Sequence, residues 1–181
     1  MSVRIVVMGP SGSGKSTVGA FLADALGARF IDGDDLHPAA NVRKMAAGIP
    51  LDDADRQPWL RLVGETLQAE ERIVVACSAL RRAYREVIRA EAPETFFAEL
   101  AIGRAVLEER MRLRADHFMP AALLDSQLQT LESLEADEHG IRVDESADVR
   151  TASAVIAAAA ALSPAEVSPC GSPSGPSRTA R

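Results

Sequence analysis

The nine residues from Gly9 to Thr17, Gly-Pro-Ser-Gly-Ser-Gly-Lys-Ser-Thr, are the part of the chain that most directly indicates chemistry. They match the phosphate-binding pattern G-x-x-x-x-G-K-[ST], between an apolar run, Val3 to Met8, and an Ala/Leu-rich segment, Val18 to Leu26. Glycines let successive backbone N–H groups turn toward an anion, and the following helix adds the positive end of its dipole. We therefore predict nucleoside triphosphate binding by Gly9, Pro10, Ser11, Gly12, Ser13, Gly14, Lys15, Ser16 and Thr17.

Two residues at the end of this loop have side chains suited to phosphate chemistry. Lys15 can bring a positive charge to the β- and γ-phosphates, and the hydroxyl group of Ser16 can ligate Mg²⁺. We therefore expect Lys15 to be catalytic and Ser16 to be a metal ligand.

A second group with chemical potential is the acidic run Asp32-Gly33-Asp34-Asp35, at the carboxyl end of the second expected strand. In open α/β sheets, ligands bind beyond the carboxyl ends of the strands, so this run should share a crevice with the loop. Alternation along an extended segment would put Asp32 and Asp34 on the same side. We assign Asp32 to the metal and Asp34 to the acceptor hydroxyl group as a catalytic residue. Asp35 could instead be a helix N-cap.

The elements that must position these groups alternate between strand and helix. Strands are expected at Arg4–Met8, Ala28–Ile31, Ile73–Cys77, Thr95–Leu100 and Ile141–Val143. Helices are expected at Ser16–Leu26, Ala39–Ala47, Asp53–Glu71, Arg81–Ala90, Arg104–Arg114, Ala121–Leu134 and Thr151–Leu162. This alternation predicts an α/β fold of the P-loop NTPase type, with a parallel five-stranded sheet and helices on both faces.

Composition limits the class of protein. With 181 residues, of which 47% are hydrophobic and 25% charged, the chain can form one domain with a proper core. A net charge of −6 does not favour a nucleic-acid partner. No apolar run approaches the roughly 20 residues that a membrane span needs, so no membrane association is expected. Cys77 and Cys170 are too few and too far apart for a disulfide framework, which favours a reducing, cytoplasmic location.

The character of the chain changes after Leu162. Residues 163–181 are dominated by Ser, Pro and Gly, with Val167 as the only bulky aliphatic residue. Such a segment buries too little apolar surface to offset the entropy of ordering it. We therefore expect the folded domain to cover residues 1–162 and residues 163–181 to form a disordered tail. The alternative for this tail is a peptide that docks on a partner.

Beyond the loop, the sequence resembles the gluconokinases of the small P-loop kinases, a group that includes shikimate kinases and nucleoside monophosphate kinases. The resemblance covers about residues 3 to 160. It rests on Asp32-Gly33-Asp34-Asp35-Leu36-His37-Pro38, Asn41, Lys44-Met45, Gly48-Ile49-Pro50-Leu51, Asp55-Arg56, Pro58-Trp59-Leu60, Cys77-Ser78-Ala79-Leu80-Arg81-Arg82, Tyr84-Arg85, His117-Phe118-Met119-Pro120, Leu124, Ser126-Gln127 and Leu131-Glu132. One departure is Asp116, where many relatives would have glycine, and it could alter the hinge of a lid.

The resemblance implies transfer of the γ-phosphoryl group of ATP to the 6-hydroxyl group of D-gluconate, with Mg²⁺ as the metal. It also implies a substrate-binding helical insert over about residues 36–70, a lid over about residues 115–124, and a homodimer.

Gluconate carries a carboxylate and a polyol chain, so its pocket needs cations and hydrogen-bonding groups. Arg56 from the insert and Arg81 beyond the third strand can grip the carboxylate through paired hydrogen bonds. His37 and Lys44 are candidate polyol contacts, and Trp59 could line the site or pack in the core. For Arg82 and Arg85, a solvated cationic helix face is an equal alternative.

Three arginines, Arg110, Arg112 and Arg114, precede the expected lid. In the resembling group, an arginine in this place lies against adenine, and a closing lid excludes water from the transfer step. Helical spacing puts these side chains on overlapping faces, and we assign Arg110 and Arg114 to ATP.

Three other functions are to be weighed against a gluconate kinase. A shikimate or nucleoside monophosphate kinase of the same fold would lack the His-Pro and Asp-Arg-Gln-Pro-Trp elements. A GTPase switch would need a guanine-reading N-K-x-D motif, but the only asparagine, Asn41, is followed by Val42. A non-catalytic nucleotide sensor would bind ATP without turnover that depends on gluconate.

Overall fold

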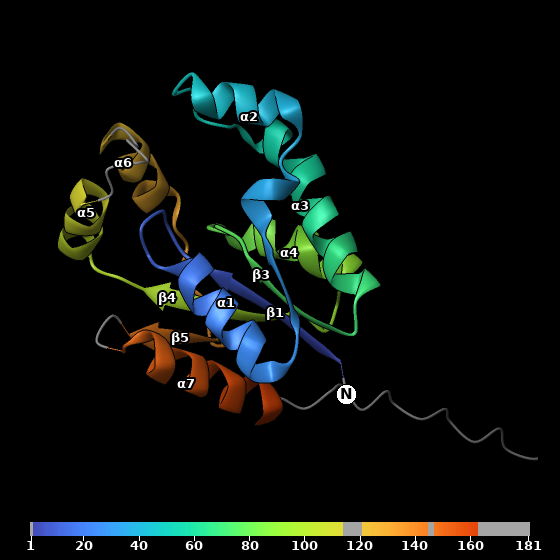
Figure 1. Cartoon of the computed structure of the whole chain (residues 1–181). Coiled ribbons are helices and arrows are strands. Elements are labelled where there is room, and N and C mark those ends of the chain that lie inside the picture. The colour runs from blue at the N-terminus through green and yellow to red at the C-terminus, as the bar shows by residue number, and fades with distance from the viewer. Residues whose placement is uncertain (1, 114–120, 145–146, 163–181) are drawn as a thin grey trace, which may run out of the picture.

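Five parallel strands form one sheet in the order β2-β3-β1-β4-β5 (Figure 1). The computed structural model describes residues 2–113, 121–144 and 147–162. Its strands are β1 (Val3–Met8), β2 (Arg29–Asp32), β3 (Arg72–Ala76), β4 (Phe96–Ala101) and β5 (Gly140–Asp144). The predicted fold class and the five strands are confirmed, with bounds that shift by at most one residue.

The central strand β1 shows why these segments form a covered sheet. Its side chains alternate between two apolar clusters, with Val6 and Met8 in one and Ile5 and Val7 in the other. All four are at most 1% exposed, as expected for a strand that is covered on both faces. The run of apolar residues therefore reflects a sheet that lies between two helical layers.

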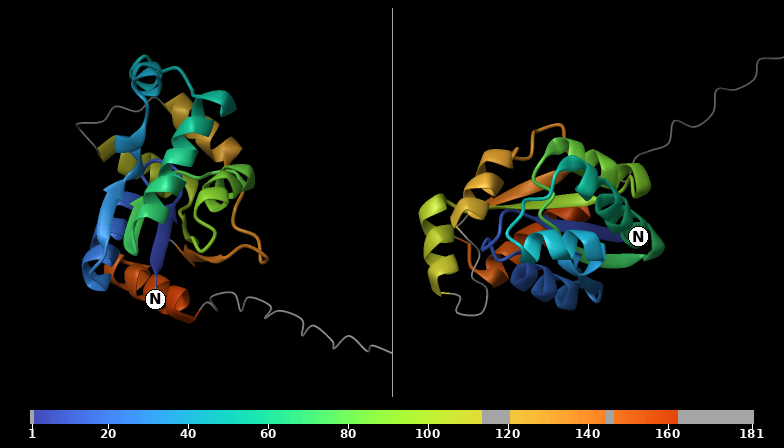
Figure 2. Two further views of the ribbon diagram at one scale, coloured as in Figure 1. Left: turned by 90° about the vertical axis from the view of Figure 1, so that its right-hand side faces the viewer. Right: turned by 90° about the horizontal axis from the view of Figure 1, so that it is seen from above.

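Helices cover both faces of the sheet (Figures 1 and 2). On one face lie α1 (Lys15–Leu26) and α7 (Val149–Leu162), which pack against each other, and on the other lie α3 (Asp53–Ala69) and α4 (Arg82–Glu91). The remaining helices are the short 3₁₀ helix η1 (Gly33–Leu36), α2 (Ala39–Ala46), α5 (Arg104–Leu113) and α6 (Ala121–Thr130). The views place α5 and α6 on one side of the phosphate loop and α2 on the other.

The predicted helix Ala121–Leu134 is too long, because α6 ends at Thr130. Tertiary hydrogen bonds hold the following residues outside the helix. The backbone N–H of Glu132 donates to the carbonyl oxygen of Leu80 at 2.8 Å, and that of Leu134 donates to the carboxylate of Glu99 at 2.7 Å. Partners in the loop after β3 and within β4 thus replace the intrahelical bonds that the pattern predicts.

Several predictions fall partly or wholly on residues outside the described ranges. The predicted lid at about 115–124 is described only from Ala121 onward, where it overlaps α6. Arg114, Asp116 and the tail 163–181 lie outside the described residues. Cys77 is buried and free, and Cys170 also lies outside. Within the described ranges, no helix is both long and apolar enough to cross a membrane.

Candidate active site

The phosphate loop connects β1 to α1 at the carboxyl edge of the sheet. Gly14 precedes the helix with a φ of 95°, a left-handed conformation that favours glycine, and α1 begins at Lys15. The Lys15 ammonium group donates to the carbonyl oxygen of Pro10 at 3.2 Å, so its side chain curves back over the loop. Loop N–H groups, helix dipole and ammonium group are thereby assembled around one point, as anion binding requires.

The end of β2 reaches the same place. The Ser16 hydroxyl group donates to the Asp32 carboxylate at 2.6 Å, which joins the start of α1 to the end of β2. A hydroxyl and a carboxylate oxygen are ligands that Mg²⁺ accepts. Within the described ranges, no group of three or more His, Cys, Asp and Glu side chains could hold a metal ion.

Asp32 and Asp34 are close for a reason that differs from the expected one. The chain does not stay extended after Asp32 but turns into η1, and the Asp32 carboxylate accepts the Asp34 backbone N–H at 3.1 Å. The N-cap is therefore Asp32, and the N-cap alternative for Asp35 is wrong, because Pro38 precedes α2. The turn leaves the Asp34 side chain 78% exposed at the mouth of the site.

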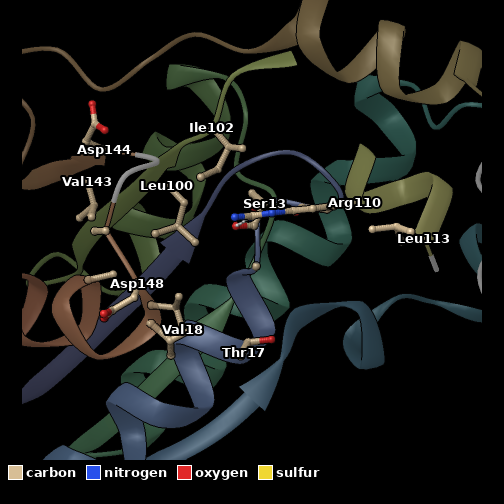
Figure 3. A pocket seen from close by; sticks show the side chains of 15 residues that line it. Ser13, Thr17, Val18, Leu100, Ile102, Arg110, Leu113, Val143, Asp144 and Asp148 are labelled. Atoms are coloured by element: carbon tan, nitrogen blue, oxygen red, sulfur yellow. Dashed lines mark hydrogen bonds between the residues drawn. The ribbon is translucent and has the colours of Figure 1, made fainter. Parts of the chain in front are cut away.

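A first cavity, of about 470 Å³, opens on one side of the loop (Figure 3). Its walls combine loop residues and Arg110 with side chains from the ends of β4 and β5 and the start of α7. They include Gly12, Ser13, Gly14, Thr17, Val18, Leu100, Ile102, Arg110, Val143 and Asp148. Apolar walls next to a phosphate loop suit the purine ring of a nucleotide whose phosphates extend into the loop.

Arg110 lies directly against the loop. Its guanidinium group donates to the carbonyl oxygens of Gly12 and Ser13, at 3.4 and 3.2 Å. Figure 3 shows its side chain extending across the mouth of the loop beside Ser13. The position agrees with the assignment of Arg110 to ATP, which stays a prediction.

A second cavity, of about 570 Å³, lies between the insert and α6. Charged and polar side chains dominate its lining, which consists of Leu51, Asp52, Asp53, Ala54, Arg56, Arg81, Ser126 and Thr130. Both arginines that were predicted to contact an acceptor carboxylate are therefore in one cavity. Its polarity fits a small hydrophilic acceptor.

Asp53 and Tyr84 organise the two arginines. The Arg81 guanidinium group lies 3.1 Å from the Asp53 carboxylate, and that of Arg56 donates to the Tyr84 hydroxyl group at 3.3 Å. The Tyr84 hydroxyl group in turn donates to Asp53. Burial and this carboxylate raise the pKa of Tyr84, so its hydroxyl group keeps its proton. The Asp53 carboxylate faces both guanidinium groups, and Asp52 also lines the cavity, so its lining offers charges of both signs to a ligand.

His37, Trp59 and Lys44 do not line this cavity. His37 stacks on Trp59 with ring centroids 4.1 Å apart, and the indole N–H donates to the carbonyl oxygen of Gly33 at 2.7 Å. Trp59 is 2% exposed and supports the turn that carries Asp34. Burial lowers the pKa of His37, more than the nearby Asp34 raises it, so the ring is neutral near pH 7. Lys44 bonds both carboxylate oxygens of Asp55, at 2.7 and 2.6 Å, and so joins α2 to α3.

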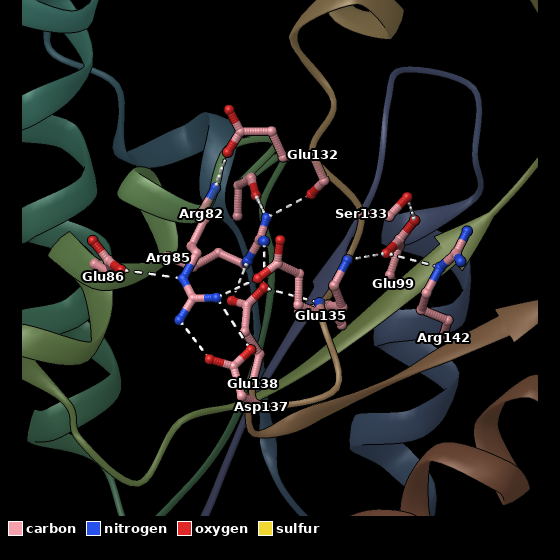
Figure 4. A network of polar contacts seen from close by, with 12 residues as sticks. Arg82, Arg85, Glu86, Glu99, Glu132, Ser133, Glu135, Asp137, Glu138 and Arg142 are labelled. Carbon is pink, nitrogen blue, oxygen red and sulfur yellow. Dashed lines mark hydrogen bonds and ion pairs between the residues drawn. The ribbon is translucent and has the colours of Figure 1, made fainter.

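Arg82 and Arg85, for which a solvated helix face was an equal alternative, belong to a network of ion pairs (Figure 4). Arg85 is fully buried and bonds both carboxylate oxygens of Glu138, at 2.7 and 2.5 Å, so the solvated face is wrong for it. Arg82 pairs with Glu135 and Asp137 at the rim of the network. The network fixes the loop between β3 and α4, where Arg81 lies.

The sequence reasoning did not assign Asp53, Tyr84, Ser126, Gln127 or Thr130 to the site. Tyr84 could have been found, since it lies three residues after Arg81 on the expected helix and so shares its face. Ser126 and Gln127 belong to the residues that carry the family resemblance, whereas Asp53 and Thr130 approach only through the packing of the insert and α6.

A comparison with protein families matches residues 5–134 to the model described as an AAA domain. The chain is 49% identical over 143 residues to a gluconokinase of Gluconobacter oxydans, covering 77% of this chain and 80% of that protein. It is 44% identical over 149 residues to the thermosensitive gluconokinase of Escherichia coli, covering 80% of each.

Among solved structures, a gluconokinase from Sinorhizobium meliloti superimposes with a TM-score of 0.81 at 47% identity. The match covers 89% of this chain and 93% of that one. A shikimate kinase from Aquifex aeolicus, at 17% identity and a TM-score of 0.54, is similar in fold alone.

Proposed function

The chain belongs to the gluconokinase family, and we propose that it transfers the γ-phosphoryl group of ATP to the 6-hydroxyl group of D-gluconate. The products are 6-phospho-D-gluconate and ADP. The observation that carries the proposal is the convergence, at one edge of the sheet, of the phosphate loop, the turn with Asp34 and the polar cavity with Arg56 and Arg81.

In the proposed reaction, ATP lies in the first cavity with its phosphates in the loop. Lys15 and the loop N–H groups stabilise the negative charge that develops on the transferring group. Arg110 holds the carbonyl side of the loop and faces the nucleotide. We assign the same nucleotide contact to Arg114, which lies outside the described residues.

D-Gluconate lies in the second cavity, with its carboxylate toward Arg56 and Arg81. Asp34 accepts a hydrogen bond from the 6-hydroxyl group, which holds that oxygen in line with the γ-phosphorus. As the new O–P bond forms and the bond to ADP breaks, the hydroxyl proton passes to Asp34. His37 and Lys44, which were predicted to contact the polyol, do not line this cavity, and Trp59 supports the turn that carries Asp34 through its hydrogen bond to Gly33. Arg85 has no place in this scheme, because its guanidinium group is buried with Glu138.

Mg²⁺ fits beside Ser16 and Asp32, whose oxygen atoms are 2.6 Å apart. When bound, it would neutralise phosphate charge and orient the β- and γ-phosphates. Within the chain itself, Asp32 keeps the Ser16 hydroxyl group oriented and anchors the turn that presents Asp34.

Replacement of Asp34 tests the proposal at the site itself. Asp34→Asn keeps the size but cannot receive the proton, so kcat should fall by about 10²–10⁴-fold, the usual contribution of a general base. The affinity for ATP, measured by titration, should barely change. Asp35→Asn is the control, because it removes the same charge one residue away. Collapse of ATP binding with surviving turnover would instead assign Asp34 to the metal.

We also propose, from the family resemblance alone, that the protein is a cytoplasmic homodimer. Light scattering after gel filtration should then give about twice the 19.2 kDa mass of one chain. A mass of one chain at micromolar concentration would contradict the dimer.

A further inference from the structure

Helix α6 contacts both halves of the site. Ser126 and Thr130, four residues apart and so on one face of the helix, line the acceptor cavity. Gln127, the residue after Ser126, points elsewhere: its side-chain Oε1 accepts a hydrogen bond from the backbone N–H of Ser11 at 2.8 Å. One helix therefore reaches the acceptor cavity with one face and the phosphate loop with another.

Helix α6 is bonded regularly at its end and is joined to helix α5 by an ion pair. The backbone N–H of Leu131 donates to the carbonyl oxygen of Gln127 at 3.0 Å, so the helical bonding continues to the end of α6. In the middle of the helix, Asp125 accepts a hydrogen bond from Arg104 of α5 at 2.6 Å. Helix α5 also carries Arg110, which bonds the carbonyl side of the loop. The loop is thus held on its carbonyl side by α5 and at Ser11 N–H by α6.

Gln127 is half-buried, and the only hydrogen bond of its side chain to the described part of the chain is the one to Ser11. An amide can accept through its oxygen while its NH₂ group donates. The NH₂ group finds no acceptor among the described residues, so it is available to a substrate oxygen. Glutamine at this point satisfies the loop N–H and brings no negative charge near the phosphates, whereas a glutamate would.

We propose that Gln127 is a positioning residue that couples occupancy of the acceptor cavity to the geometry of the phosphate loop. The inference rests on the proposed function, since it takes D-gluconate as the ligand of that cavity. Gluconate bound against Ser126 and Thr130 fixes α6, and Gln127 then fixes Ser11. Coupling between binding sites is reciprocal, so each substrate raises the affinity for the other.

Calorimetric titration tests this coupling. The magnesium complex of the ATP analogue adenylyl imidodiphosphate is titrated into the full chain with and without saturating D-gluconate. In the unaltered chain, gluconate should tighten binding of the analogue about 5-fold or more. In Gln127→Met, which keeps the length of the side chain but removes the acceptor, the factor should fall below about 2-fold. Gln129→Met, at an exposed position on the same helix, should keep the full factor.

A conservative variant separates the hydrogen bond from the general integrity of the helix. Gln127→Glu keeps an acceptor oxygen for Ser11 N–H, so it should retain the coupling, although its charge should weaken binding of the analogue in both titrations. The inference is overturned if the unaltered chain shows no coupling, if Gln127→Met keeps it, or if Gln129→Met loses it equally. Absence of gluconate-dependent ADP release from the unaltered chain would instead refute the proposed function.

Discussion

Replacing the buried Glu138 by glutamine should destabilise this protein by about 3 kcal/mol near pH 7. The Glu138 side chain is 1% exposed and that of Arg85 is fully buried. Two hydrogen bonds, of 2.7 and 2.5 Å, join them, and Arg89 adds a third contact at 3.2 Å. Breaking one partner of such a pair leaves an uncompensated buried charge, which costs about 3–5 kcal/mol.

The pKa of Glu138 gives a second route to the magnitude. Burial by itself would raise that pKa, but the hydrogen bonds from Arg85 and from the Glu135 backbone lower it from 4.5 to about 2. At about 1.4 kcal/mol per pH unit, this difference corresponds to roughly 3 kcal/mol, in agreement with the first estimate. For a chain of this size, the melting temperature should fall by about 6–12 °C.

The effect has a definite pH dependence. Because the folded-state pKa is lower than the unfolded one, the stabilisation is fully present above pH 4.5 and is lost as the pH falls toward 2. The glutamine variant does not titrate at this position. The stability gap between the two proteins should therefore narrow by about 1.4 kcal/mol per pH unit below pH 4.5.

Urea unfolding, followed by circular dichroism between pH 7 and pH 3, measures this gap. Glu86→Gln is the matched control, because Glu86 pairs with Arg82 on the same helix but is 61% exposed. It should change stability by less than about 1 kcal/mol. A cost below 1 kcal/mol for Glu138→Gln, or a gap that stays constant down to pH 3, would refute the reasoning.

Three further changes test other parts of the account. Lys15→Ala should fold normally but lose on the order of 10²-fold or more in kcat, and near-normal turnover would contradict the phosphate-loop assignment. Gly64→Ala should lower the unfolding free energy by about 1–3 kcal/mol, because the added Cβ would lie 2.7 Å from the Cβ of Glu91 where α3 packs on α4. A gain in stability would show that this packing is looser. A chain that ends at Leu162 should keep its melting temperature within about a degree and both KM values, and a clear change in either would mean that the tail docks on the domain.

Local patterns were sufficient for most of the fold. The β-branched runs, the glycine-rich loop and the helical periodicity between them predicted the sheet and most element bounds to within two residues. They failed where a hydrogen bond from outside the regular pattern decides the conformation, through a side chain two residues away at Asp34 and through distant partners at the end of α6. The turn at Asp34 depends on the Asp32 carboxylate, and the end of α6 depends on bonds from Glu132 to Leu80 and from Leu134 to Glu99.

The candidate site could be predicted only in part. Loop residues and the arginines of the acceptor cavity were found because each follows a strand or a recognisable motif. The role of Arg85 could not be predicted, because its burial depends on an ion pair with Glu138. That residue lies 53 positions later in the sequence, so no local pattern indicates the pair. The contact of Gln127 with the phosphate loop could not be predicted for the same reason, because its partner Ser11 lies far away in the sequence.

ADP release by the purified chain, with Mg²⁺-ATP and a panel of acceptors, tests the central claim most directly. D-Gluconate should stimulate release strongly, and phosphate should appear on its C6 oxygen in amounts equal to the ADP formed. Shikimate and nucleoside monophosphates should leave release at the level seen without acceptor. Equal ADP release with and without D-gluconate, or preferential stimulation by another acceptor, would contradict the account.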